Sequence, residues 1–350
     1  MKYFREAYKN YSAYETADDV YDIYLYANEN PINLFITLTD DEKDDILFLD
    51  YNRYPDSDCR SLKEAYADYA GVLPENITVG NGSDELIRVI GDVFLENGEY
   101  VISHEPTFSM YARCAEVARG NYYGVMPRDD SLRANADDII AKANELKAKL
   151  IFICNPNNPT GELWDEEDII KIIKNTDSVV VIDEAYGEFA GINSAYLANE
   201  YNNVIILKTL SKAFAMAGMR VGFAIASKEI SDVLNMAVDT YNVNTFSQAA
   251  AKLMLTRKDK MRIIAKDLAA EAKRLGEELA KFDGITVYPT VTNFVLIKTD
   301  KNKEIYEALK KSGILVRGYS KGLLSDYLRI SAGTRSENDS FLKVVSEVMS

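Results

Sequence analysis

Short apolar runs alternate with segments of helical periodicity through the middle of this 350-residue chain. The runs VISH, LIFIC, VVVID and VIIL occupy positions 101–104, 150–154, 179–183 and 204–207, and a further short strand pattern covers 76–79. Most of these positions are apolar, which is typical of strands covered by helices on both faces of a sheet. The alternation therefore predicts an α/β fold built on a mainly parallel sheet.

The C-terminal third has a different pattern. Positions 230–282 are almost wholly helical in periodicity, a stretch long enough to carry the chain away from the first sheet. Strand patterns follow near 294–298, 315–317 and 327–330. Because a single hydrophobic core stops growing at roughly 250–300 residues, we expect two domains. We predict a large domain over 36–248, and a small α+β domain made of 249–350 and of 1–35, which includes an N-terminal arm.

Composition excludes several classes of function. The formal net charge of −15 argues against a nucleic-acid partner, because binding a polyanion requires a broad basic surface. Cys59, Cys114 and Cys154 lie far apart, and the single histidine, His104, cannot form a metal site alone. We expect reduced thiols, a structural histidine and no metal. The N-terminus lacks a signal-peptide core and no apolar run approaches the roughly 18 residues of a membrane span, so we expect a cytoplasmic protein without a membrane partner.

Polar side chains follow three of the predicted strands. Asn158 lies in the turn after 150–154, Asp183 ends the run 179–183, and Lys212 comes shortly after 204–207. Such strand ends meet at one edge of a parallel sheet, where ligands bind in open α/β folds. Taken alone, Lys212 would be a solvated surface lysine and Asp183 a helix cap. Hydroxyl groups flank Lys212 and Arg220 follows it, so the group indicates a partly desolvated amine beside a phosphate site.

The segment GNGSDE at 80–85 permits two interpretations. It resembles the dinucleotide-binding pattern GxGxxG, but Glu85 stands where the third glycine belongs. The better interpretation is a strand-to-helix turn whose backbone N–H groups, at Ser83 and Asp84, bind one phosphate. The same residues could also form an ordinary helix cap, and the two roles are compatible.

Together these segments resemble the class II pyridoxal-phosphate aminotransferases of fold type I, and most closely their histidinol-phosphate branch. The resemblance runs nearly from end to end, and the run around Lys212 is its most specific part. The matching pieces are YANENP (26–31), RYPD (53–56), GNGSDE (80–85), EPTFSMY (105–111), NPNNPTG (155–161), DEAYGEF (183–189), TLSKAFAMAGMR (209–220), TNF (292–294), GILVRG (313–318) and LRISAGT (328–334).

The resemblance implies pyridoxal 5′-phosphate as the cofactor and gives each residue a role. Lys212 would carry the cofactor as a Schiff base and later move a proton between the substrate Cα and the cofactor. Asp183 would pair with the protonated pyridine nitrogen. Asn158 and Tyr186 would hydrogen-bond the phenolate oxygen of the ring, and Phe108 would stack on the ring face. The implied phosphate site comprises Ser83, Asp84, Thr209, Ser211 and Arg220, with Tyr54 reaching it from a neighbouring subunit.

The substrate side of the resemblance is less complete. Arg329 matches the arginine that binds an anionic group of the substrate, and Arg317 matches a second arginine of the histidinol-phosphate branch. Without this resemblance, we would interpret both residues as arginines that are solvated or paired with carboxylates. Tyr14 and Asn28 are the other implied substrate-binding residues. The sequence departs from the family pattern here: Ala13 replaces a proline, the acidic stretch that follows is short, and INL at 32–34 replaces a stretch that usually contains glycine and proline.

The resemblance therefore implies a homodimeric aminotransferase that exchanges an amino group between histidinol phosphate and 2-oxoglutarate, in histidine biosynthesis. Its partners would be a small-molecule amino donor and a 2-oxo acid. An aromatic or broad-specificity amino-acid aminotransferase and a threonine-phosphate decarboxylase are alternatives. A pyridoxal-phosphate-binding regulatory module is disfavoured, because no basic helix-turn-helix domain accompanies the enzyme fold.

Overall fold

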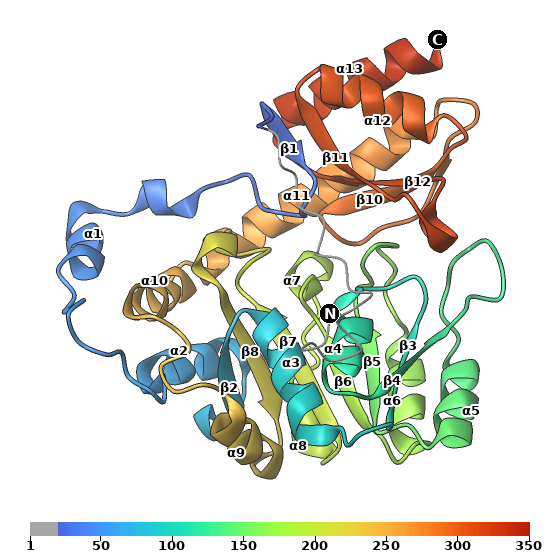
Figure 1. Cartoon of the computed structure of the whole chain (residues 1–350). Helices are drawn as coiled ribbons and strands as arrows, with labels where there is room; N and C mark the ends of the chain where they lie inside the picture. The colour runs from blue at the N-terminus through green and yellow to red at the C-terminus, as the bar shows by residue number, and fades with distance from the viewer. Residues whose placement is uncertain (1–19) are drawn as a thin grey trace, which may run out of the picture.

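The computed structural model describes residues 20–350 and contains a seven-stranded and a five-stranded sheet (Figure 1). The larger sheet has the strand order β2 (Ile77–Asn81), β8 (Val221–Ala226), β7 (Val204–Thr209), β6 (Val179–Asp183), β5 (Leu150–Cys154), β3 (Tyr100–His104) and β4 (Asn121–Val125). β8 runs antiparallel to both of its neighbours, and the other adjacent pairs of this sheet are parallel. The predicted mainly parallel α/β fold is confirmed.

Helices cover both faces of this sheet because successive strand residues point to opposite sides. Val181 and Ile205 pack toward one layer, and Val180 and Ile206 toward the other. The first layer contains α3 (Ser83–Phe94), α4 (Met110–Val117) and α9 (Lys228–Ala237). The second contains α2 (Arg60–Ala70), α5 (Ala136–Leu146), α6 (Glu166–Lys174), α7 (Gly187–Ala190), α8 (Leu197–Glu200), α10 (Thr245–Leu255) and the first half of α11 (Lys258–Leu279).

The smaller sheet has the order β1 (Ile23–Leu25), β11 (Ile314–Gly318), β12 (Tyr327–Ser331), β10 (Phe294–Lys298) and β9 (Thr286–Val287). It packs against α12 (Asn302–Lys311), α13 (Arg335–Met349) and the second half of α11, and lies above the larger sheet in Figure 1. β1 brings the N-terminal part of the described chain into this sheet, parallel to β11. The domain boundaries at 35/36 and 248/249 stay a prediction. Most of α10 and the start of α11 lie after position 248, and they pack on the larger sheet.

Residues 26–59 form an arm that leaves the small sheet and returns to α2, with α1 (Asp40–Leu47) at its far end (Figure 1). The short helix η2 (Leu34–Thr37) precedes α1, and Thr39 begins α1 with a capping box to Glu42. Arg257 of the body holds this helix through an ion pair to Glu42 at 2.6 Å. The remaining 3-10 turns are η3 (Pro74–Asn76), η4 (Ala217–Met219) and η5 (Gly322–Leu324).

Some local expectations were wrong. Strands β1, β4, β8 and β9 were not predicted, because their runs are short, polar or rich in small residues and depend on pairing with remote strands. The helical region 230–282 is three helices with breaks at 238–244 and 256–257. Within 20–350, no helix is both long and apolar enough to cross a bilayer.

Candidate active site

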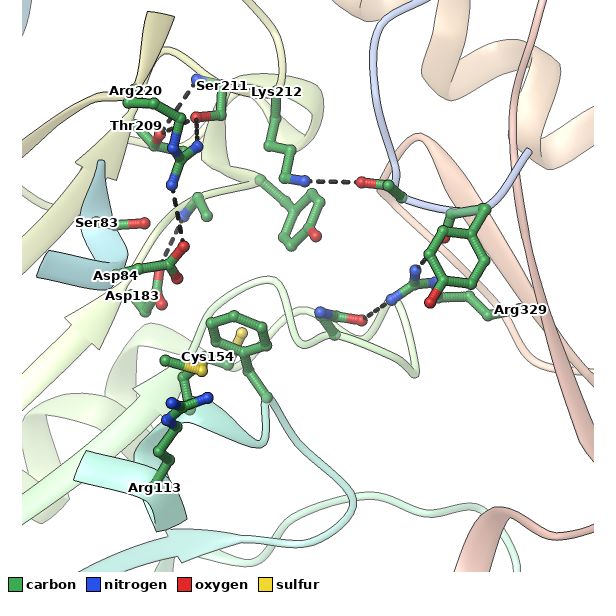
Figure 2. Close-up of a pocket in the computed structure, with 17 residues that line it drawn as sticks. Ser83, Asp84, Arg113, Cys154, Asp183, Thr209, Ser211, Lys212, Arg220 and Arg329 are labelled. Carbon is green, nitrogen blue, oxygen red and sulfur yellow. Dashed lines mark hydrogen bonds and ion pairs between the residues drawn. The ribbon is translucent and has the colours of Figure 1, made fainter. Parts of the chain in front are cut away.

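A cavity of about 480 Å³ opens at the edge of the larger sheet where β5, β6 and β7 end, below the smaller sheet. Figure 2 shows side chains from these strand ends, from α3 and α4, and from β12 converging on it. The residues predicted for the cofactor that line the cavity are Ser83, Asp84, Phe108, Asn158, Asp183, Tyr186, Thr209, Ser211, Lys212 and Arg220. The parallel register explains the convergence, because Cys154 lies beside Asp183 and Asp183 beside Leu207 across adjacent strands.

Lys212 supplies an amine inside this cavity. Its Nζ donates a hydrogen bond to the backbone oxygen of Ala27, 2.8 Å away, and lies 5.9 Å from the centre of the Tyr186 ring. Burial lowers the pKa of Lys212 to about 8, and the nearby Arg329 guanidinium acts in the same direction. A fraction of the amine is therefore neutral near pH 7, which is the form that can act as a nucleophile.

The predicted phosphate site combines a helix terminus with hydroxyl and guanidinium groups. Arg220 Nη2 donates to Asp84 Oδ2 at 3.0 Å, and Thr209 Oγ1 donates to Ser211 Oγ at 3.0 Å. Ser83 begins the twelve-residue helix α3, whose first N–H groups have no partner within the helix. Gly82 precedes it with φ of +78°, and a Cβ there would lie 2.6 Å from Arg220 Nη2. Glycine is therefore required for the arginine to lie beside the helix terminus.

Asp183 is a carboxylate buried beneath the cavity. Its Oδ1 accepts from the Ala185 N–H at 3.0 Å, and its Oδ2 accepts from the Tyr111 hydroxyl at 2.8 Å. Burial raises the pKa of Asp183 to about 6, although both hydrogen bonds act in the opposite direction. A cation placed next to the carboxylate would favour its ionised form. Tyr111 stacks on Phe152, with ring centres 4.6 Å apart, so its hydroxyl is held in place.

The other residues predicted to contact the cofactor ring lie on the walls of the cavity. Tyr186 OH accepts a hydrogen bond from Asn28 Nδ2 at 2.9 Å, and Asn158 Oδ1 accepts one from Arg329 Nη1 at 2.6 Å. Phe108 lies two residues before α4, which begins at Met110. Its ring meets that of Tyr111 edge to face, at 5.8 Å between centres.

Of the two predicted substrate arginines, Arg329 lines this cavity and Arg317 lines a neighbouring one. Arg329 on β12 is buried and donates from Nη2 to the Tyr26 backbone oxygen at 2.6 Å. Arg317 on β11 hydrogen-bonds the Tyr26 hydroxyl. A second cavity of about 340 Å³ shares Phe108, Asn158 and Arg329 with the first and adds Arg317 and Lys321. A ligand reaching from Lys212 past Arg329 would therefore enter a basic chamber.

Two predicted site residues in the described part of the chain, Tyr54 and Asn28, line neither cavity. Tyr54 is 80% exposed and stacks on Tyr241, with ring centres 4.5 Å apart. Asn28 is buried, and its side chain is engaged by protein groups instead of facing the cavity. Tyr14 lies outside the described residues. Conversely, some residues that line the cavity were not predicted, although most lie in or beside the motif segments. They include Tyr26, Ala27, Met110, Arg113 and Cys154.

Comparison with known proteins identifies the family. The model of the family "aminotransferase class I and II" matches residues 22–345. The chain belongs to this family. Our aminotransferase is 39% identical over 346 residues to the histidinol-phosphate aminotransferase of Thermoanaerobacter sp. (strain X514), covering 99% of this chain and 98% of that protein. The Clostridium novyi (strain NT) protein of the same name is also 39% identical, over 335 residues that cover 96% and 94%.

A solved structure has the same fold as this aminotransferase. It is the histidinol-phosphate aminotransferase from Sinorhizobium meliloti in complex with pyridoxal-5′-phosphate. Its TM-score is 0.88 at 23% sequence identity, and the match covers 100% of this chain and 98% of that one. The predicted fold type and family are confirmed.

The cavity residues of this aminotransferase fit pyridoxal phosphate, its predicted cofactor. Lys212 offers an amine with a lowered pKa, Arg220 and the α3 N-terminus offer an anion site, and the buried Asp183 offers a counter-charge for a cationic ring nitrogen. The described residues contain no cluster of three or more His, Cys, Asp or Glu side chains suited to a metal ion. Cys59, Cys114 and Cys154 are buried free thiols.

Proposed function

We propose that this chain transfers an amino group between histidinol phosphate and 2-oxoglutarate, as a cytoplasmic enzyme of histidine biosynthesis. The observation that carries the proposal is the pair of adjacent chambers that share Phe108, Asn158 and Arg329. The first contains Lys212 beside an anion site, and the second adds Arg317 to the Arg329 that both share. The relatives named histidinol-phosphate aminotransferase, at 39% identity over nearly the whole chain, support the same substrate.

The residues of the first chamber divide the chemical work. When bound, pyridoxal phosphate supplies an electron sink that stabilises negative charge at the substrate Cα. Lys212 would hold the cofactor, and its Nζ would carry the proton that leaves the substrate Cα. Asp183, which is buried, would pair with a protonated ring nitrogen and stabilise its charge. The small sheet covers the cavity and limits the access of water to Lys212.

The residues of the second chamber orient the substrate. Histidinol phosphate carries a phosphate dianion, and planar guanidinium groups suit its oxygen atoms. Arg329 is held by Asn158 and by the Tyr26 carbonyl, so its side chain is already ordered before a ligand arrives. The same arginine would accept the α-carboxylate of glutamate, so both substrates of the exchange could bind at one position.

Half-reactions test this function. The protein carrying its cofactor is mixed separately with histidinol phosphate, phenylalanine and threonine phosphate, and the absorbance of the cofactor is followed. We expect fast conversion with histidinol phosphate. Arg317→Ala should lower kcat/KM for histidinol phosphate about 10- to 100-fold, since a charge-assisted hydrogen bond contributes roughly 1.5–3 kcal/mol. The same change should leave kcat/KM for phenylalanine nearly unaltered. Equal losses for both substrates would refute the phosphate role of Arg317.

We further propose that the enzyme works as a homodimer in which Tyr54 reaches the neighbouring phosphate site. In this chain Tyr54 projects from the arm that includes α1 and makes no contact with the cavity of its own subunit. Exposed apolar side chains occur along the same arm, among them Ile36, Leu47 and Phe48. A two-fold partner that covers this arm would bury these side chains and complete both sites at once.

A further inference from the structure

Asn28 occupies an unusual place between the two sheets. It is fully buried, with φ of +55°, in the left-handed region that asparagine tolerates better than most residues. Its backbone N–H donates to Ser331 Oγ at 2.8 Å, and its backbone oxygen accepts from Asn293 Nδ2 at 3.0 Å. Its side chain bonds Ser331 on one side and Tyr186 on the other. All its hydrogen-bonding groups are thus engaged with parts of the chain that are remote in sequence.

The donors and acceptors of this cluster fix the direction of each bond. Ser331 Oγ accepts from the Asn28 backbone and donates its proton to Asn28 Oδ1 at 2.9 Å. Asn28 Nδ2, which can only donate, therefore faces the Tyr186 oxygen. The Tyr186 oxygen accepts this bond, so the phenolic proton remains available to another acceptor. Burial raises the pKa of Tyr186, which keeps that proton on the oxygen at neutral pH.

The cluster also connects the small sheet with the first chamber. Ser331 lies two residues after Arg329 on β12, on the strand that supplies the shared arginine. Tyr186 comes from the turn after β6 and lines the first cavity. The hydrogen-bonded path Ser331, Asn28, Tyr186 therefore runs from the arginine strand of the small sheet to the wall of the cofactor cavity.

We propose that Asn28 is a positioning residue that directs the Tyr186 proton into the cofactor cavity, toward the anionic ring oxygen, and does not itself bind substrate. Through Ser331, the position of the small sheet then sets the orientation of this proton. The inference rests on the proposed function, because it requires pyridoxal phosphate in the cavity. It replaces the substrate-binding role that the sequence motif suggested for Asn28.

Asn28→Asp tests the direction of the bond. The aspartate has the same shape and keeps the contact with the Ser331 hydroxyl, but a carboxylate accepts from Tyr186 and turns the phenolic proton away from the cavity. The matched control is Asn33→Asp, which adds the same charge on the same arm at an exposed helix cap where aspartate serves equally well. The readout is the pH midpoint at which the absorbance of the cofactor bound to Lys212 changes, measured without substrate.

We expect Asn28→Asp to raise this midpoint by roughly one pH unit, the shift that corresponds to one lost hydrogen bond to the ring anion. Tyr186→Phe should produce a shift of similar size, and Asn28→Asp should add nothing in the Tyr186→Phe background. Asn33→Asp should leave the midpoint unchanged. A purely structural role for Asn28 would instead lower the melting temperature without moving the midpoint.

Ser331→Ala provides a second route if the buried aspartate prevents folding. Loss of the hydroxyl frees the Asn28 amide, so the midpoint should rise by a smaller amount, again only when Tyr186 is present. An unmoved midpoint in Ser331→Ala and in any folded Asn28→Asp protein would overturn this inference alone. Wild-type protein that binds no cofactor on Lys212 would overturn the proposed function, and the inference with it.

Discussion

His104, the single histidine of the chain, should make the protein unusually sensitive to mild acid. Its ring is 1% exposed and packs edge-on against Trp164, with ring centres 5.3 Å apart. Neither ring nitrogen forms a hydrogen bond within the described chain, and burial lowers the pKa of His104 to about 4. The nearby Asn157 amide offsets only part of this effect.

The sign of the effect follows from proton binding. Below pH 6.5 the unfolded chain binds a proton at His104, whereas the folded chain does not bind it until the pH falls to about 4. Protonation therefore favours the unfolded state throughout this window, and the free energy of unfolding falls as the pH falls. At 1.36 kcal/mol per pH unit, the loss is about 2 kcal/mol between pH 6.5 and 5 and about 3 kcal/mol when complete.

His104→Phe removes the titrating group and keeps a ring against Trp164. Urea unfolding is followed by the fluorescence of Trp164, the single tryptophan, at one protein concentration with excess cofactor. At pH 7.5 the variant should be at least as stable as the wild type, because the two ring nitrogens have no partners to lose. At pH 5 the wild type should have lost about 2 kcal/mol more than the variant. Equal losses in the two proteins would refute the argument.

Three further predictions concern the site. Asp183→Asn should leave the cofactor attached to Lys212 but slow proton removal from the substrate by at least 100-fold, as measured by stopped-flow absorbance. An unchanged rate would contradict the role of Asp183 as the partner of the ring nitrogen. Arg220→Ala should weaken cofactor binding about 10- to 100-fold in equilibrium dialysis, because a charged contact with the phosphate is lost. The control is Arg60→Ala, at the exposed start of α2, which should change cofactor binding little. Mixed dimers of Lys212→Ala and Tyr54→Phe subunits should regain activity, since one site then has both native residues; proven mixed dimers without activity would place Tyr54 in its own subunit's site.

The strand ends were predictable from sequence because the signal is local. A buried apolar run followed by a polar residue places Asn158, Asp183 and Lys212 at one edge of any parallel sheet, and the structure has that arrangement. The resemblance to aminotransferases, confirmed by the family match, extended the prediction to the phosphate site.

The supporting contacts were not predictable, because they join remote segments. Tyr111 meets Asp183 across 72 positions, and Asn28 meets Ser331 across 303. Strand β8 was missed for a related reason. Its run VGFAIA is rich in small residues and becomes a strand through pairing with β2 and β7, which precede it in the chain. The local sequence pattern therefore identifies the candidate site residues, whereas the residues that hydrogen-bond and position them are known only from the fold.

Helix α11 couples the mechanics of the two halves of the molecule. Its 22 residues span about 33 Å, and its first half, with Met261 and Leu268, belongs to the core under the large sheet. Its second half, with Leu275 and Leu279, belongs to the core of the small sheet. A continuous helix resists bending, so a tilt of the small sheet would be carried along α11 to its first half, which packs against α7. Any movement of the small sheet over Lys212 would therefore also shift the packing of the large core.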